Sequence, residues 1–218
     1  MQTSPRLRPQ HLIVAAAAVL LAACTQDVTG TAVRATGAGP DATGGDQNAC
    51  VSVSAPLDDI PTEDDSEPLL RIPVPDGWER NTMMDNDVIR YSIVSDDLVA
   101  NGFATNAVVT LESVRGSQDP AEVFDQNRAN LETGLGAFDL ETIDTTTCGL
   151  PAETTYYIAP QMGSAPERPV VMHAVVAEDG GYTFLATLTI QTTEPDDPQY
   201  LDDAQEIVDG FQMVLPDS

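Results

Sequence analysis

Few side chains in this sequence could carry out catalysis or hold a metal ion. Histidine occurs at His11 and His173, and the three cysteines are Cys24, Cys50 and Cys148. His173 stands in an otherwise apolar strand and could act as a general base. A hydrolase triad also needs an activated serine, however, and the chain has no Gly-x-Ser-x-Gly sequence. We therefore expect His173 to be a structural histidine of the core or of a sheet edge.

Metal sites are not indicated by the remaining groups. Cys50 and Cys148 are best explained as one disulfide in an exported chain, with two buried free thiols as the alternative. One histidine with two distant cysteines does not make a zinc site. Asp85-Asn86-Asp87 and the acidic run at 58–67 lack the ligand spacing of a calcium loop, so we interpret both as solvated acidic surface. The sequence predicts neither a metal nor a cofactor.

Cys24 closes an N-terminal segment built like an export signal. Arg6 and Arg8 supply positive charge, residues 12–22 are uniformly apolar, and Leu-Ala-Ala directly precedes Cys24. Such an apolar run is too short to cross a bilayer, which takes about 20 residues. The segment resembles a bacterial lipoprotein signal, which implies that Cys24 receives a lipid and becomes the first residue of the mature chain. Simple secretion is the alternative.

The composition excludes several classes of function. The chain has 35 acidic and 9 basic residues, a formal net charge of −26, and the basic residues are all arginine. Such a surface repels nucleic acids and anionic headgroups, so we expect no nucleic-acid partner. The absence of lysine removes P-loop, Schiff-base and Ser–Lys chemistry, and we expect no enzyme. The preference for Ala, Asp and Arg over Lys is typical of a GC-rich, actinobacterial genome.

The chain divides into three predicted parts. Residues 1–23 form the signal peptide, residues 24–49 the lipidated N-terminus with a flexible linker rich in Gly, Thr and Ala, and residues 50–218 a single globular domain.

Two helices and five to seven mostly antiparallel strands predict an α+β fold for that domain. Asp-Pro pairs are expected to start both helices, one at 120–133 and one after Asp197-Pro198 whose apolar stripe is Leu201, Ala204, Val208 and Phe211. Alternating apolar residues predict strands at 87–94, 107–115, 138–143, 153–159, 170–177 and 182–191, with a proline-containing edge strand at 69–75. Trp78, the one tryptophan, is expected to anchor its turn.

The order of these features resembles the LpqN/LpqT family of mycobacterial lipoproteins over residues 50–216. The resemblance rests on the signal, the linker and the hairpin around 178–181, together with local sequences at Pro75-Asp76-Gly77-Trp78, Asp119-Pro120, Gly149-Leu150-Pro151-Ala152 and Gly210-Phe211. It implies a PsbP-like fold, an antiparallel sheet flanked by helices in an α/β/α sandwich, in the envelope of a mycobacterium or a relative. The family offers no catalytic residues to carry over.

Three functions follow from these features. The first is a non-enzymatic accessory lipoprotein, held on the outer face of the cell membrane by lipidated Cys24, that binds an envelope lipid or glycolipid or docks on a lipid transporter. The second is a protein-interaction adaptor whose acidic surface meets a basic partner. The third is a hydrolase that uses His173. An apolar pocket of several hundred Å³ favours the first, and a filled core with an exposed apolar patch favours the second.

Overall fold

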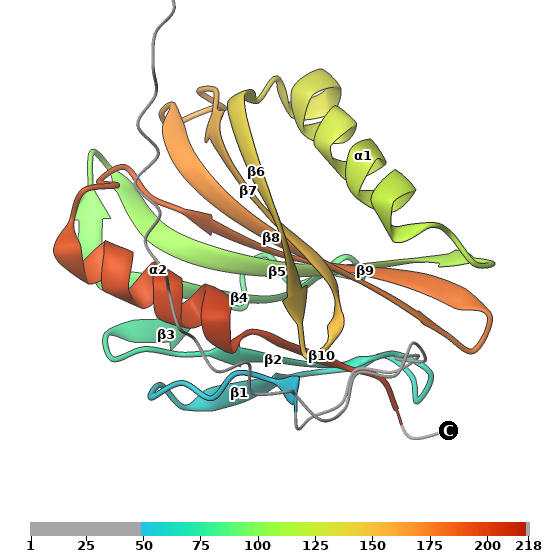
Figure 1. Cartoon of the computed structure of the whole chain (residues 1–218). Helices are drawn as coiled ribbons and strands as arrows, with labels where there is room; N and C mark the ends of the chain where they lie inside the picture. Colours follow the sequence, from blue (N-terminus) through green and yellow to red (C-terminus); the bar gives the residue numbers. More distant parts are fainter. Residues whose placement is uncertain (1–48, 217–218) are drawn as a thin grey trace, which may run out of the picture. The chain divides into compact units, whose positions relative to one another are not determined.

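The central element is a seven-stranded, fully antiparallel sheet with the strand order β3-β4-β5-β9-β8-β7-β6 (Figure 1). The computed structural model describes residues 49–216, so the signal peptide, Cys24 and nearly all of the linker lie outside the described residues. The strands, in sheet order, are β3 (Trp78–Arg80), β4 (Ile89–Ala100), β5 (Phe103–Arg115), β9 (Tyr182–Gln191), β8 (Arg168–Asp179), β7 (Leu150–Ala159) and β6 (Phe138–Thr147).

A second, three-stranded sheet and two helices complete the described fold. The second sheet has the order β1-β2-β10, with β1 (Leu57–Ile60), β2 (Leu69–Pro73) and β10 (Gln212–Val214). The helices are α1 (Pro120–Asn130), which continues as a π-helical turn (Leu131–Leu135), and α2 (Pro198–Gly210). The predicted α+β class is therefore confirmed, with more strands than the sequence indicated.

Two-residue turns close three hairpins of the large sheet. In each turn both residues have positive φ, as the right-handed twist of a tight hairpin requires. These residues are Asn101 and Gly102 between β4 and β5, Cys148 and Gly149 between β6 and β7, and Gly180 and Gly181 between β8 and β9. The turn predicted at 178–181 is confirmed, and the register of all three strand pairs is set locally.

The two helices begin where the Asp-Pro pairs predict. Asp119 accepts a hydrogen bond from the backbone N–H of Ala121 at 2.8 Å, and Asp197 accepts from Gln199 at 2.8 Å and from Tyr200 at 3.2 Å. The first helix ends later than predicted, because the π-helical turn carries it to Leu135 and Gly136 closes it at φ 77°. The capping residues therefore predicted the first residue of each helix more accurately than the last residue of α1.

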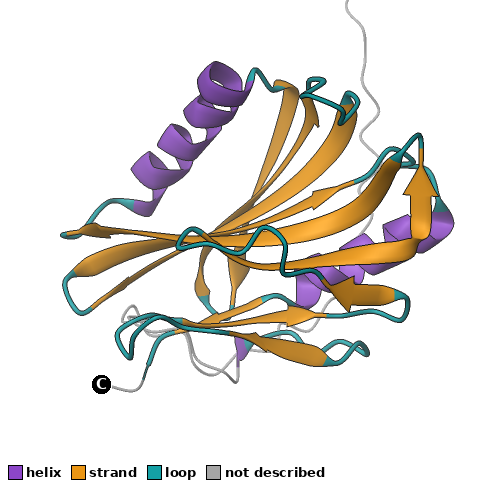
Figure 2. Cartoon of the chain, turned by 180° about the vertical axis from the view of Figure 1, so that it is seen from behind, coloured by secondary structure: helices purple, strands orange, loops and turns teal. Residues whose placement is uncertain are grey.

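The helices cover opposite faces of the large sheet (Figures 1 and 2). On one face Phe124 of α1 packs with Ala174 and Val176 of β8. On the other face Ile207 of α2 belongs to the main core, which includes Val175 of β8 and also residues of the three-stranded sheet. The predicted α/β/α sandwich is thus present, and the second sheet shares the α2 side.

Two sequence-based predictions are wrong, one about the pairing of a strand and one about the buried face of a helix. The segment 69–75 was expected to be an edge strand, but β2 pairs with β1 on one side and β10 on the other. Its proline, Pro73, is the last residue of the strand, where it interrupts little of the ladder. The buried face of α2 consists of Tyr200, Ala204, Ile207 and Gly210, whereas Leu201 of the predicted stripe is exposed.

Trp78 holds β3 against α2. Its indole is buried, and Nε1 donates a hydrogen bond to Asp203 Oδ2 at 2.8 Å. The side chain therefore has the structural role expected from the sequence, although it anchors a helix as well as its own turn.

Candidate functional site

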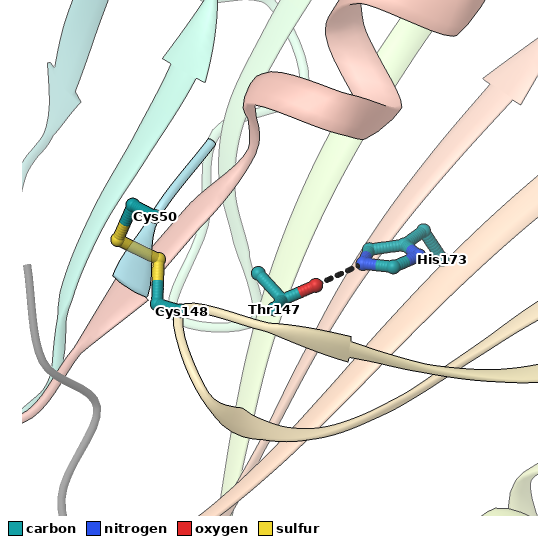
Figure 3. Close-up of a disulfide and its surroundings, with 4 residues drawn as sticks. All are labelled: Cys50, Thr147, Cys148 and His173. Atoms are coloured by element: carbon teal, nitrogen blue, oxygen red, sulfur yellow. Dashed lines mark hydrogen bonds between the residues drawn. A yellow bond between two sulfur atoms is a disulfide. The ribbon is translucent and has the colours of Figure 1, made fainter. Parts of the chain in front are cut away.

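A short segment at the start of the described residues, the N-terminal strap (residues 50–55), is fixed at both ends. Cys50 is bonded to Cys148 in the β6–β7 turn with an S–S distance of 1.99 Å, the pairing expected from the cysteine count (Figure 3). At the other end the backbone N–H groups of Ser54 and Ala55 both donate to Glu206 Oε1 at 2.8 Å. These donors, Ala55 first, hold the pKa of the Glu206 carboxyl below its ordinary value. The strap thereby joins α2 to the end of the large sheet.

A cavity of about 400 Å³ opens beside this strap. Helix α2 forms one wall, and the facing side chains of β6, β7 and β8 form the other. Val51 of the strap and Phe211, just after α2, complete the lining. The volume lies within the range of about 300 to 1,000 Å³ that small-molecule sites occupy.

The rim of the cavity is apolar and exposed. Four large side chains that border it keep between 42% and 58% of their surface exposed, and they come from four different elements: Val51, Ile143, Tyr156 and Leu201. Exposed apolar side chains scattered singly over a surface need no explanation, but several around one opening indicate a binding site. Leu201 therefore contributes to this opening and not to the core stripe in which the sequence placed it.

The inner wall of the cavity is polar and centred on His173. Thr147 Oγ1 lies 2.7 Å from His173 Nε2 (Figure 3). On the other side of the ring Thr154 Oγ1 lies 2.8 Å from Nδ1. The ring of Phe211 packs edge to face against the imidazole, with 6.3 Å between the two ring centroids. Burial lowers the pKa of His173 to about 4, although the Asp209 carboxylate partly opposes this shift. The imidazole is therefore neutral at pH 7, donating one hydrogen bond to a threonine and accepting one from the other.

This arrangement is suited to binding rather than to proton transfer. Thr147 and His173 resemble a nucleophile with its base, but a base works best when its pKa lies near the operating pH, and that of His173 is about three units lower. Both ring nitrogens are also occupied by threonine hydroxyls, so no carboxylate orients the ring as in a triad. The structure buries His173 in the sheet, as the sequence indicated.

A change of His173 to glutamine should flatten the acid limb of the stability curve. Because the pKa of His173 falls from 6.5 to about 4 on folding, the unfolded chain binds more protons between these pH values. The neutral, buried His173 therefore contributes fully to the free energy of unfolding above pH 6.5, and this contribution is lost as the pH falls toward 4. Between pH 7 and 4 the wild type should lose about 3 kcal/mol more stability than His173→Gln.

Urea denaturation of both proteins at half-unit pH steps measures this difference. Glutamine can still hydrogen-bond to both threonines but does not titrate. The pH dependence contributed by all other titratable groups is then the same in both proteins and cancels in the difference. Parallel curves for the two proteins would contradict a buried, neutral His173.

The structure brings some predicted residues together and not others. Cys148 and His173 both line the cavity, whereas Cys24 lies outside the described residues. The acidic segments take part in ion pairs, Arg80 with Asp85 at 2.6 Å and Arg90 with Glu67 at 2.6 Å. The side chains of Arg90 and Glu67 are only 9% and 11% exposed, so the solvated surface expected for the acidic run at 58–67 is wrong for Glu67. Within residues 49–216 no group of three or more His, Cys, Asp or Glu side chains could hold a metal ion. None of the helices in that range is long and apolar enough to cross a membrane.

Sequence reasoning missed most of the cavity. Its threonine hydroxyl groups come from Thr145, Thr146, Thr147 and Thr154, residues that carry no motif. A weak signal was present in Ile143, the one apolar residue in the second half of β6, and in Leu201, which widens the apolar stripe of α2 beyond what the core needs.

Solved structures with a similar fold include a mycobacterial envelope protein. The structure titled LpqN involved in cell envelope biogenesis of Mycobacterium tuberculosis has 20% identity and a TM-score of 0.60, with 73% of this chain and 91% of that chain covered. A Pseudomonas aeruginosa protein of unknown function, titled a putative regulator, has 20% identity and a TM-score of 0.41, covering 62% and 85%. The Ran-binding protein Mog1p of Saccharomyces cerevisiae has 13% identity and a TM-score of 0.43, covering 73% and 96%.

The family is shown by a sequence comparison. No curated protein sequence matches the chain. The family model described as probable lipoprotein LpqN, however, matches residues 56–214, from just before β1 to the end of β10 and so nearly all of the described fold. Because this match spans far more than half of the chain, the protein belongs to the LpqN family of cell-envelope lipoproteins.

Proposed function

We propose that this protein is a non-enzymatic accessory lipoprotein that binds an envelope lipid or glycolipid in the cavity between α2 and the large sheet. The cavity is the observation that carries the proposal. Its apolar rim, which includes Tyr156 and Leu201, suits an aliphatic chain, and the threonine hydroxyls suit the hydroxyl groups of a polar head. The low pKa of His173 supports a binding role over a hydrolytic one.

The proposed anchor is Cys24, lipidated and held in the outer face of the cell membrane. Two or more acyl chains suffice for lasting attachment, since each buried CH₂ contributes about 0.8 kcal/mol. The tether enters the fold at Cys50, and the next residue, Val51, already borders the cavity. A ligand could thus pass between the membrane or an envelope lipid transporter and a site close to the attachment point.

Native mass spectrometry of the full-length protein, purified from an actinobacterial host and followed by organic extraction, tests both parts. We expect a chain that begins at an acylated Cys24 and that carries an additional, extractable lipid or glycolipid. An acylated chain without extractable ligand would overturn the cavity proposal and leave the anchor standing. A chain without acyl groups would overturn the anchor.

Two matched variants locate the ligand. Tyr156→Glu combined with Leu201→Glu places two carboxylates on the rim, where they should lower ligand affinity at least about tenfold, because burying a charge against an aliphatic chain is unfavourable. Val88→Glu combined with Val99→Glu makes the same change at exposed sites that do not line the cavity, and it should leave the affinity unchanged. Equal effects of the two pairs would place the ligand elsewhere.

A further inference from the structure

The outermost strand β6 leaves one long edge of the large sheet open. Within residues 49–216 β6 pairs with β7 alone. Its pairing with β7 is regular from Glu141 to Thr147, and this segment of β6 contains neither glycine nor proline. The other outer strand, β3, has 3 residues, against 10 in β6. An outer strand presents a row of unpaired backbone N–H and C=O groups, to which a further strand can bind.

The side chains along this edge define what could bind. Residues 141–146 are all exposed, and the edge carries two carboxylates, Glu141 and Asp144, that have no ion-pair partner among the described residues. Because side chains alternate along a strand, these two acids point to opposite faces of the sheet. Ile143 lies on the same face as Glu141 and is exposed at the rim of the cavity.

We propose that β6 is a docking edge to which another envelope protein adds an extended segment with two lysine or arginine residues three positions apart. In an antiparallel pairing, the first residue of the segment would be basic and lie opposite Asp144, and the second would be apolar and lie opposite Ile143. The third would be a small residue opposite Thr142, and the fourth a basic residue opposite Glu141. Backbone hydrogen bonds supply the affinity of such strand addition, and cross-strand pairs supply its register. The net charge of −26 attracts a basic partner.

Charge and composition disfavour two other occupants. A second copy of this chain, paired through its own β6, would offer the same acidic strand without a basic residue, so it could not pair with either carboxylate. The linker at 25–49 is acidic on balance and rich in Gly, with a proline at Pro40, and such sequences form strands poorly. A basic segment from a different protein satisfies both the hydrogen-bonding edge and its charges.

An added strand would also extend the wall of the cavity. Ile143, Thr145 and Thr147 of β6 line the cavity, so the inward side chains of the new strand would stand beside the opening. Docking and ligand exchange would then occur at one place, although the docking edge itself does not depend on a ligand in the cavity.

A synthetic peptide of sequence Thr-Val-Thr-Lys-Val-Thr-Lys tests the docking edge on the full-length protein. Fluorescence anisotropy should show that this peptide binds about tenfold more tightly than the version with glutamate in place of lysine, and hydrogen–deuterium exchange should show protection of residues 138–147. A version with proline in place of the second valine, the residue opposite Ile143, should lose binding, because proline cannot donate a hydrogen bond to the ladder. Protection elsewhere, or equal binding of the proline version, would overturn the proposal.

A charge swap separates the edge from the general acidity of the surface. The variant E141K/D144K should reverse the preference and bind the glutamate peptide more tightly. The control D65K/D202K makes the same change of net charge at exposed sites on the β1–β2 loop and on α2, and it should keep the lysine preference. If E141K/D144K still prefers the lysine peptide, or if the wild type dimerises through residues 138–147, the docking edge is refuted.

Discussion

Replacement of both Cys50 and Cys148 by alanine should lower the free energy of unfolding by about 4 to 5 kcal/mol. The two cysteines are 98 residues apart, and the bond restricts the unfolded chain by closing a loop of that length. In the folded protein the same bond holds the strap on the β6–β7 turn, next to Thr147 of β6, which hydrogen-bonds to His173. Its loss should therefore both release entropy of the unfolded chain and loosen one side of the cavity.

Denaturation by guanidinium chloride of the oxidised wild type and of Cys50→Ala/Cys148→Ala measures the effect. The third cysteine offers a matched control, because Cys24→Ala removes a sulfur that takes no part in this bond and should leave the unfolding free energy unchanged. A loss below about 1 kcal/mol in the double variant would contradict the loop-closure contribution expected of this bond.

The features that the sequence predicted correctly are those set by neighbouring residues. Asp119-Pro120 and Asp197-Pro198 start the helices because the cap, the proline and the first backbone N–H groups lie within three positions. Gly180 and Gly181 close a hairpin because two positive φ angles suffice to pair the strands beside them. Such contacts between residues close in the sequence determine where a helix or strand begins. In a hairpin they also determine which two strands pair.

The second sheet and the cavity depend on contacts that no local pattern reveals. Strand β2 pairs with β10, about 140 residues later, so Met213 lies opposite Leu70. The cavity likewise combines the strap, side chains of the three strands β6, β7 and β8, and one side of α2. In α2 the helical period predicted an amphipathic helix, but it could not show that Leu201 faces an opening while Ile207 faces the core.

The other large effect is expected on the opposite face of the sheet, where α1 is held by an ion pair. Arg128 donates to the carboxylate of Glu153 in β7 and to that of Asp125 one turn earlier in the helix. Glu153 is only 1% exposed, and its second oxygen accepts from Thr155 Oγ1 at 3.1 Å. Arg128→Ala would leave this carboxylate buried without its counter-ion, at a cost of about 3 to 4 kcal/mol.

The matched variant Arg128→Met/Glu153→Met separates the ion pair from simple packing. Removing both charges and filling the space with apolar atoms should cost less than about 1 kcal/mol, since the desolvation of the pair offsets much of its attraction. Hydrogen exchange should speed up throughout α1 in Arg128→Ala, because Phe124 is the one buried residue of that helix. If the single and the double variants lose equal stability, packing of the arginine side chain, and not the unpaired charge of Glu153, holds α1 on the sheet.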